Sequence, residues 1–279
     1  MSDTTPAADL TLVLGGNGKT GRRVIERLGA LGRNVRAGSR SGSPRFDWDD
    51  RSTWGAALAG ASRIYVTYQP DLAVPAALPT VTAFFAQAVA SGVTHIVLLS
   101  GRGEPEAEAA EEALKASGAD WTVLRCSWFS QNFSEGFLLE PILGGEVALP
   151  AGDVPEPFID VEDIADVAVA ALTQPGHSGQ LYEMTGASAV TFAQAVASIA
   201  RATGRQIRYT RVSPEDFRAA LVEAQVSPAE VDLVLYLQTT ILDGRNERVT
   251  DGVQRALGRA PRSFDEYVQR EAAAGTWRV

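Results

Sequence analysis

Short apolar runs alternate with amphipathic segments along the first part of the chain. Residues Leu10–Leu14 form a β-type apolar run that ends in the sequence GGNGKTG. A helical stripe follows, with apolar residues at Val24, Ile25, Leu28 and Leu31. Residues Asn34–Ala37 then predict a second strand. The order strand, glycine-rich turn, helix and strand is the opening of a βαβ unit.

The same alternation continues beyond this opening. Further strands are predicted at residues 63–67, 95–100 and 121–125, and further helices at 79–90, at 104–116 and over the stripe Ile164, Val167, Ala168, Ala171 and Leu172. The run HIVLLS at 95–100 is almost continuously apolar, which is typical of a strand buried on both faces. Repeated βα alternation predicts an α/β fold with a doubly wound parallel sheet.

The pattern changes near residue 131, where loops replace the regular alternation. The interruptions come from Pro141, Gly144, Gly145, Pro150, Gly152, Pro155 and Pro157. Later helices have clear start signals: Thr191 with Gln194 forms a capping box, and Pro214 follows Ser213. We therefore expect residues 1–130 to form a dinucleotide-binding Rossmann region. Residues 131–279 are expected to form a small, mostly helical substrate lobe, with roughly 158–185 returning to the Rossmann core.

Composition and charge exclude several classes of protein. The 279 residues are 45% apolar, enough for a sizeable core, and the net charge of −9 disfavours binding to nucleic acid. Cys126 is the single cysteine, so it forms no disulfide within the chain, and with His95 and His177 it cannot complete a zinc site. The N-terminal residues have no basic n-region and no long apolar run, so we expect no signal peptide, and no segment approaches the ~20 apolar residues of a membrane span. We expect a cytoplasmic monomer or homodimer that acts on a small molecule.

The glycine-rich turn is the first candidate for chemistry. Gly15, Gly16, Asn17, Gly18, Lys19, Thr20 and Gly21 fit both GxGxxG and GxxGxxG. Both patterns give a tight turn, close approach of the backbone to a pyrophosphate, and a helix N-terminus whose N–H groups face the phosphates. A tight turn without a ligand is the alternative. A mononucleotide P-loop is excluded, because its first glycine would fall at Val13, inside the strand.

The end of the second strand decides between NAD and NADP. An NAD-binding protein usually carries an acidic residue there for the ribose 2′-hydroxyl, but this chain has no acid before Asp47. Arg40 is placed to hold a 2′-phosphate through charge-assisted hydrogen bonds, with help from Ser39, Arg36 and Lys19. The sequence therefore favours NADP(H), and solvated loop arginines are the alternative.

A family resemblance extends well beyond the glycine turn. The segments that carry it are, in order, GGNGKTGRRV, VRAGSRS, FDWDD, LLSGRG, WTVLRCSWFSQNF and FIDVEDIADVAVAAL. Together they resemble the NmrA-like atypical short-chain dehydrogenases, in the branch related to fungal festuclavine synthases and bacterial NADPH-dependent quinone oxidoreductases. The resemblance spans about Leu10 to Tyr209. It implies an NAD(P)-binding Rossmann domain with a small C-terminal substrate lobe.

The resemblance also implies roles for individual residues. The loop from Gly15 to Gly21 would bind the pyrophosphate, Ser39 and Arg40 the 2′-phosphate, and Trp48 and Asp49 would lie near adenine. Thr67, Tyr68, Gln69 and Pro70 would follow the fourth strand, Ser100 and Gly101 would end the fifth, and Cys126, Ser127 and Trp128 would follow the sixth and flank the nicotinamide. Family members usually carry proline at the position of Cys126, and a small core residue is the simplest interpretation of this thiol.

The catalytic pair of ordinary short-chain dehydrogenases is missing. None of the six tyrosines has a lysine four residues later, so carbonyl reduction through Tyr-x-x-x-Lys is disfavoured. Hydride addition to an iminium needs no acid, and quinones and enones need only a weak donor, for which Ser100 and Tyr68 are candidates. Tyr68, Trp128, Phe129 and Phe133 would suit a flat substrate. The glutamates Glu104, Glu106, Glu108, Glu111 and Glu112 are expected to form a solvated helix face.

Two functions remain open from the sequence. The first is an NADPH-dependent reductase of an iminium, quinone or enone. The second is a non-catalytic NADP(H) sensor that binds a protein partner, as the namesake regulators of the NmrA-like family do.

Overall fold

A computed structural model describes residues 9–279 and divides them into two compact units. The first unit comprises the chain up to Cys126, Val161–Met184 and Gly252–Arg259. The second comprises Ser127–Asp160, Thr185–Asp251 and Ala260–Val279. Val161–Met184 and Gly252–Arg259 therefore belong to the first unit, so the predicted substrate lobe at 131–279 does not include residues 252–259.

The first unit is built on a six-stranded sheet with the order β2-β1-β3-β4-β5-β7, in which every pair of neighbouring strands is parallel. The strands are β1 (Leu10–Leu14), β2 (Asn34–Gly38), β3 (Ala61–Val66), β4 (His95–Gly101), β5 (Asp120–Cys126) and β7 (Gln180–Met184). All five residues of β1 are buried, as expected for a strand with helices on both faces. The predicted doubly wound parallel sheet is therefore confirmed.

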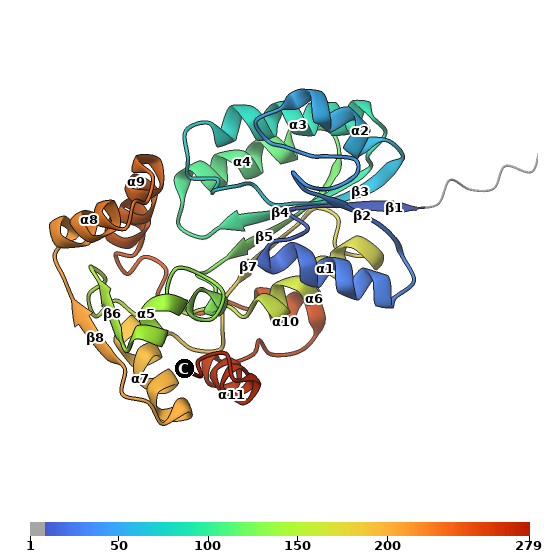
Figure 1. Ribbon diagram of the computed structural model, residues 1–279. Coiled ribbons are helices and arrows are strands. Elements are labelled where there is room, and N and C mark those ends of the chain that lie inside the picture. Colours follow the sequence, from blue (N-terminus) through green and yellow to red (C-terminus); the bar gives the residue numbers. More distant parts are fainter. Residues whose placement is uncertain (1–8) are drawn as a thin grey trace, which may run out of the picture. The chain divides into compact units, whose positions relative to one another are not determined.

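Helices cover both faces of this sheet (Figure 1). One face carries α2 (Trp54–Leu58), α3 (Ala77–Ala90) and α4 (Pro105–Lys115), and the other carries α1 (Lys19–Ala30), α6 (Val161–Thr173) and α10 (Gly252–Leu257). Apolar side chains from β1, β3 and β4 pack against Val81, Phe84 and Phe85 of α3 to form the main core of this unit. This alternation places the carboxyl ends of all six strands along one edge, where open α/β folds bind ligands.

The strand numbering differs from the one that the resemblance implies. Residues 39–50, between β2 and the short 3-10 helix Arg51–Thr53, form no strand. The strands expected as fourth, fifth and sixth are thus β3, β4 and β5. The loop at 39–50 instead lies beside the carboxyl ends of β1 and β2, and several of its residues line a cavity there.

The second unit is mostly helical. It contains α5 (Leu139–Gly144), α7 (Phe192–Thr203), α8 (Pro214–Glu223), α9 (Pro228–Tyr236), a π-helical turn (Leu237–Ile241), α11 (Phe264–Ala274) and a 3-10 turn (Ser130–Phe133). Its two strands, β6 (Glu146–Leu149) and β8 (Arg208–Arg211), pair in parallel. The predicted caps are present, since Thr191 and Gln194 form a capping box and the Ser213 hydroxyl accepts from the Asp216 amide. Among residues 9–279, no helix combines the length and apolar character required to cross a membrane.

Candidate dinucleotide site

A cavity of about 490 Å³ lies at the carboxyl ends of β1 and β2 and at the loop after β3. Its lining comes from three segments that the sequence analysis had singled out, namely the glycine turn, the end of β2 with its following loop, and the segment after β3. The lining residues are Gly15, Asn17, Gly18, Gly38, Ser39, Arg40, Ser41, Phe46, Asp47, Trp48, Asp49 and Gln69. The fold thus brings together residues that are far apart in the sequence.

The glycine turn has the shape needed to hold a phosphate. Gly15 has φ +65°, and a Cβ at this position would overlap the Thr67 hydroxyl. A Cβ at Gly21 would overlap the Gly15 carbonyl, so both glycines are required for the turn itself. At Gly18, which has φ −78°, a Cβ would lie 3.1 Å from the Gly15 carbonyl oxygen, a tight contact without overlap. Gly18 therefore keeps the cavity open and is less critical for the turn.

Helix α1 directs its N-terminus at this turn. Gly18 is the N-cap residue and provides no side-chain cap, and the first turn carries no acidic residue. The N–H groups of the first turn, which have no partner in the helical hydrogen-bond pattern, and the positive end of the helix dipole thus favour an anion at this turn. The residues present therefore fit a pyrophosphate, whose oxygens accept hydrogen bonds from such groups.

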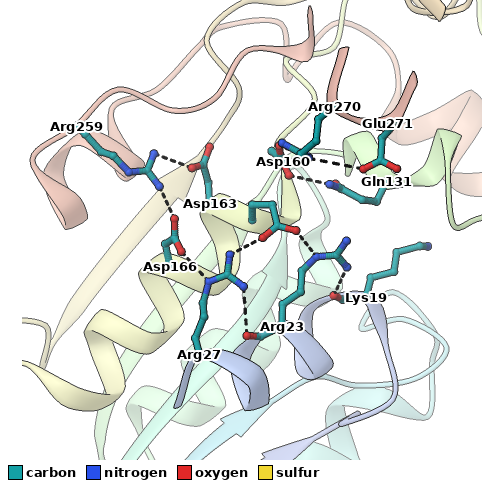
Figure 2. A network of polar contacts seen from close by, with 11 residues as sticks. Lys19, Arg23, Arg27, Gln131, Asp160, Asp163, Asp166, Arg259, Arg270 and Glu271 are labelled. Atoms are coloured by element: carbon teal, nitrogen blue, oxygen red, sulfur yellow. Dashed lines mark hydrogen bonds and ion pairs between the residues drawn. The ribbon is translucent and has the colours of Figure 1, made fainter. Parts of the chain in front are cut away.

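An ion-pair network anchors α1 to the rest of the first unit (Figure 2). Arg23 donates to Glu162 at 2.5 Å, and Arg27 donates to both Glu162 and Asp166, the latter at 2.8 Å. Arg259 continues the network to Asp166 at 2.6 Å and to the buried Asp163 at 2.7 Å. Burial opposes ionisation of Glu162, but hydrogen bonds from the two arginines outweigh it and lower the pKa of its carboxyl. The network holds the phosphate-facing helix against α6.

Arg40 and Arg36 have different surroundings. The Arg36 guanidinium donates to the Ala57 and Ala59 carbonyls, both at 2.7 Å, so its predicted help with a 2′-phosphate is disfavoured. Arg40 is exposed on the cavity wall, and within residues 9–279 no group forms a hydrogen bond or ion pair with it. Asp47, also on the wall, is paired with Arg45 at 2.5 Å. Arg40, at the end of the cavity beside β2, is therefore available to bind a phosphate.

Aromatic packing shapes the loop beside Arg40. The Trp48 indole N–H donates to the Thr67 carbonyl at 3.2 Å, and its ring contacts Phe46 and Tyr68, with centroids 5.0 Å apart in both pairs. Burial raises the pKa of the half-buried Tyr68 phenol, which is opposite to the activation that a tyrosine acid requires. Tyr68 thus packs against the wall of the cavity, while its neighbour Gln69 lines it.

The ends of β4 and β5 differ from the expected arrangement. The Ser100 hydroxyl donates to Glu111 of α4 at 2.6 Å, and Arg125 completes the pairing of that carboxylate with bonds of 2.9 and 2.6 Å. Glu111 is 0% exposed, so the expectation of a fully solvated glutamate face on this helix is wrong. Ser100 has a structural partner, and its proposed contact with substrate stays a prediction.

The chain passes from the first unit to the second between Cys126 and Ser127. Cys126 is buried, and burial raises the pKa of its thiol well above the ordinary value, which fits an unreactive core residue. Trp128 belongs to the second unit, where its ring meets Phe192 edge to face at 5.7 Å. Phe133 is fully buried in the core of the same unit, so its expected contact with a substrate is disfavoured. Ser127 is buried in that unit as well.

Two acidic residues that the sequence analysis did not single out as catalytic lie at the carboxyl edge of the sheet. Asp71 follows β3, and Glu104 precedes α4 and is 8% exposed, which also contradicts the expected solvated face. Burial, followed by repulsion from Asp71, raises the pKa of Glu104 to about 9. Burial likewise raises the pKa of Asp71. In the local sequence, a role for Glu104 could have been suspected only from its position directly after a buried strand and a Gly-Arg-Gly turn.

Comparisons with known proteins identify the family of the chain and its class of cofactor. Residues 15–175 match a family model described as NAD(P)H-binding, and residues 108–268 match that of the NmrA-like family. The chain is 30% identical to agroclavine dehydrogenase of Claviceps fusiformis, over 92% of this chain and 95% of that protein. These matches confirm the nicotinamide dinucleotide cofactor that the sequence predicts.

Solved structures share the fold over nearly the whole chain. The NADPH-dependent quinone oxidoreductase QOR2 of Escherichia coli, complexed with NADPH, superposes with a TM-score of 0.79 at 23% identity, over 93% of this chain and 99% of that one. NmrA, a negative transcriptional regulator in complex with NADP, superposes with a TM-score of 0.68 at 17% identity, over 97% of each chain. With the two family matches, each spanning more than half of the sequence, the chain belongs to the NmrA-like family of NAD(P)H-binding proteins.

Proposed function

We propose that this protein is an NADPH-dependent oxidoreductase that reduces a small, flat or cyclic activated acceptor such as an iminium, a quinone or an enone. The observation that carries the proposal is the cavity that joins the glycine turn to Arg40 at the carboxyl edge of the parallel sheet. The names of the relatives, a dehydrogenase of agroclavine and a quinone oxidoreductase, support this class of reaction. When bound, the nicotinamide supplies a hydride, and the chain supplies binding and orientation.

The preference for NADP(H) over NAD(H) rests on Arg40. Its guanidinium lies on the cavity wall and has no hydrogen-bonded or ion-paired partner within residues 9–279. A 2′-phosphate would accept charge-assisted hydrogen bonds from it, with the Ser39 hydroxyl at the same wall. The NAD-type alternative needs an acidic side chain at the end of β2, where this chain has Gly38 and Ser39.

The remaining residues of the site bind and orient. Gly15 and Gly21 keep the turn closed, Gly18 keeps room for the pyrophosphate, and the N–H groups of α1 neutralise part of its charge. The contact between Trp48 and Tyr68 fixes the loop that carries Gln69 at the cavity wall. These contacts need no tyrosine acid.

The proposal is tested by titrating NADPH and NADH into the protein and by following NADPH oxidation with a panel of quinones, enones and cyclic iminium salts. Tighter binding of NADPH than of NADH, together with turnover of at least one acceptor class, is the expected result. Selective NADPH binding without turnover of any acceptor would favour a non-catalytic regulator, the function named for the NADP complex of NmrA. Equal binding of the two cofactors would refute the role of Arg40.

A further inference from the structure

Asp71 and Glu104 come from neighbouring strands and meet at the same edge of the sheet. β3 and β4 pair in parallel from Arg63 with His95 to Val66 with Leu98, so their carboxyl ends lie side by side. Asp71 sits five residues beyond the end of β3, two residues after Gln69 of the cavity wall. Glu104 sits three residues beyond the end of β4. The two acids therefore occupy the edge where the nicotinamide dinucleotide is bound in open parallel sheets.

The two carboxyl groups contact each other in a confined space. The Asp71 and Glu104 carboxyl groups interact, and each influences the pKa of the other. Asp71 Oδ1 also accepts from the Ala73 amide at 2.8 Å, whereas Glu104 Oε2 is buried and has no hydrogen-bond partner within residues 9–279. A Cβ at Gly101 would overlap the Glu104 carboxyl, so the glycine at the end of β4 makes room for it. Although Glu104 is the N-cap residue of α4, its side chain does not cap that helix. The side chain is thus turned away from its own helix and toward Asp71.

Two carboxyl groups that lie this close to each other in a buried place repel unless one of them keeps a proton. Within residues 9–279, no lysine or arginine lowers the pKa of the Asp71 or Glu104 carboxyl. A third acid, Glu106, raises both pKa values further through its negative charge. The nearby Arg102 donates to Glu183 at 2.6 Å. With Glu104 raised to a pKa of about 9, the pair retains one proton at neutral pH.

We propose that the Asp71–Glu104 pair is the proton donor of the reduction, an inference that rests on the proposed reductase function. The acceptor gains a hydride from the reduced cofactor and a proton from the pair. The O–H bond of the shared carboxyl breaks, a new O–H bond forms on the acceptor oxygen, and the electron pair stays on the carboxylate. Water then returns the proton to the pair. A quinone is thereby converted to a hydroquinone, and an enone to a ketone through its enol.

The pair also narrows the substrate class. An iminium already carries positive charge and takes up hydride without a proton, so a retained acid brings it no advantage. A quinone or an enone gathers negative charge on oxygen as it is reduced, and a positioned acid typically contributes 10²–10⁴-fold to such a step. The buried pair therefore favours an oxygen-centred acceptor.

The test compares Glu104→Gln and Asp71→Asn with the control Glu112→Gln. Glu112 lies on α4, the helix that Glu104 precedes, and its side chain is 71% exposed. Each variant is assayed with NADPH and two acceptors, menadione and a cyclic N-methyl iminium salt. We expect kcat for menadione to fall about 10²-fold or more in Glu104→Gln. The iminium rate, the NADPH affinity and the control variant should each stay within about threefold of wild type. The wild-type menadione rate should also decline above about pH 9, whereas the iminium rate should not.

A second readout needs neither cofactor nor acceptor. The infrared spectrum of the free protein at pH 7 should contain a carboxylic acid band that is absent from Glu104→Gln and present in Glu112→Gln. An equal loss with both acceptors, an unchanged menadione rate in Glu104→Gln, or the absence of the band would each overturn the proton donor. A wild-type protein that reduces neither acceptor and still shows the band would instead refute the reductase function.

Discussion

Replacement of Glu104 by glutamine tests the retained proton through stability. The variant keeps the size and neutrality of the protonated side chain, and its amide can donate to the Asp71 carboxylate that Glu104 contacts. In the wild-type fold the Glu104 pKa is about 9, against an ordinary value of 4.5. The folded state thus binds this proton more tightly than the unfolded state. The stabilisation of the folded state by this proton is therefore complete below about pH 4.5 and is lost progressively as the pH rises to about 9.

The size of the effect follows from the width of this window. Each pKa unit corresponds to about 1.4 kcal/mol, so the three pH units between 5 and 8 give an upper limit of about 4 kcal/mol. Because Asp71 shares the proton and its pKa is also raised, part of the shift belongs to the pair. We expect the free energy of unfolding of Glu104→Gln, relative to wild type, to increase by about 2–4 kcal/mol from pH 5 to pH 8.

Urea unfolding of both proteins at several pH values between 5 and 9 measures this difference. Glu112→Gln is the matched control, because its side chain is 71% exposed, and it should follow wild type at every pH. If Glu104→Gln lowered stability equally at pH 5 and pH 8, then Glu104 would be ionised in the folded protein, and the interpretation of the pair would be wrong.

Four further predictions address the cofactor site and its support. Arg40→Ala should weaken NADPH binding by about 1.5–3 kcal/mol and leave NADH binding nearly unchanged, measured by fluorescence titration; equal losses would contradict the 2′-phosphate contact. Gly18→Val should abolish dinucleotide binding in a protein that still folds, as checked by circular dichroism, and unchanged affinity would place the pyrophosphate elsewhere. Tyr68→Phe should keep kcat within about tenfold of wild type, since its ring packs against Trp48; a loss beyond about 10³-fold would restore tyrosine acid catalysis. Glu162→Gln should destabilise the fold by about 1–3 kcal/mol at pH 7, because the arginines stabilise the ionised form of Glu162. The loss should become smaller as the pH falls below about 4.5, where this carboxyl takes up a proton. A loss independent of pH would mean that packing, not charge, accounts for it.

The alternation of elements and the glycine turn could be predicted because both are local properties of the chain. Short runs of five or six residues predicted β1, β4 and β5, whose observed bounds differ from the expected ones by a residue or less at each end. The spacing of Gly15, Gly18 and Gly21 reflects steric limits at one turn, since a Cβ at Gly15 would overlap Thr67, directly after β3, and a Cβ at Gly21 would overlap the Gly15 carbonyl. The absence of an acid at the end of β2 was also visible without any tertiary information.

The environment of the charged residues was decided only by the tertiary structure. In the sequence Glu104, Glu111 and Glu112 are three glutamates near one helix, yet the fold buries the first two and exposes the third. Likewise Arg36 and Arg40 are four residues apart, but only Arg36 meets backbone carbonyls of another segment. Their partners come from other elements: Asp71 from the loop after β3, Ser100 from β4 and Arg125 from β5. A carboxyl group ionises or keeps its proton according to such partners and its burial, and neither can be read from its local sequence.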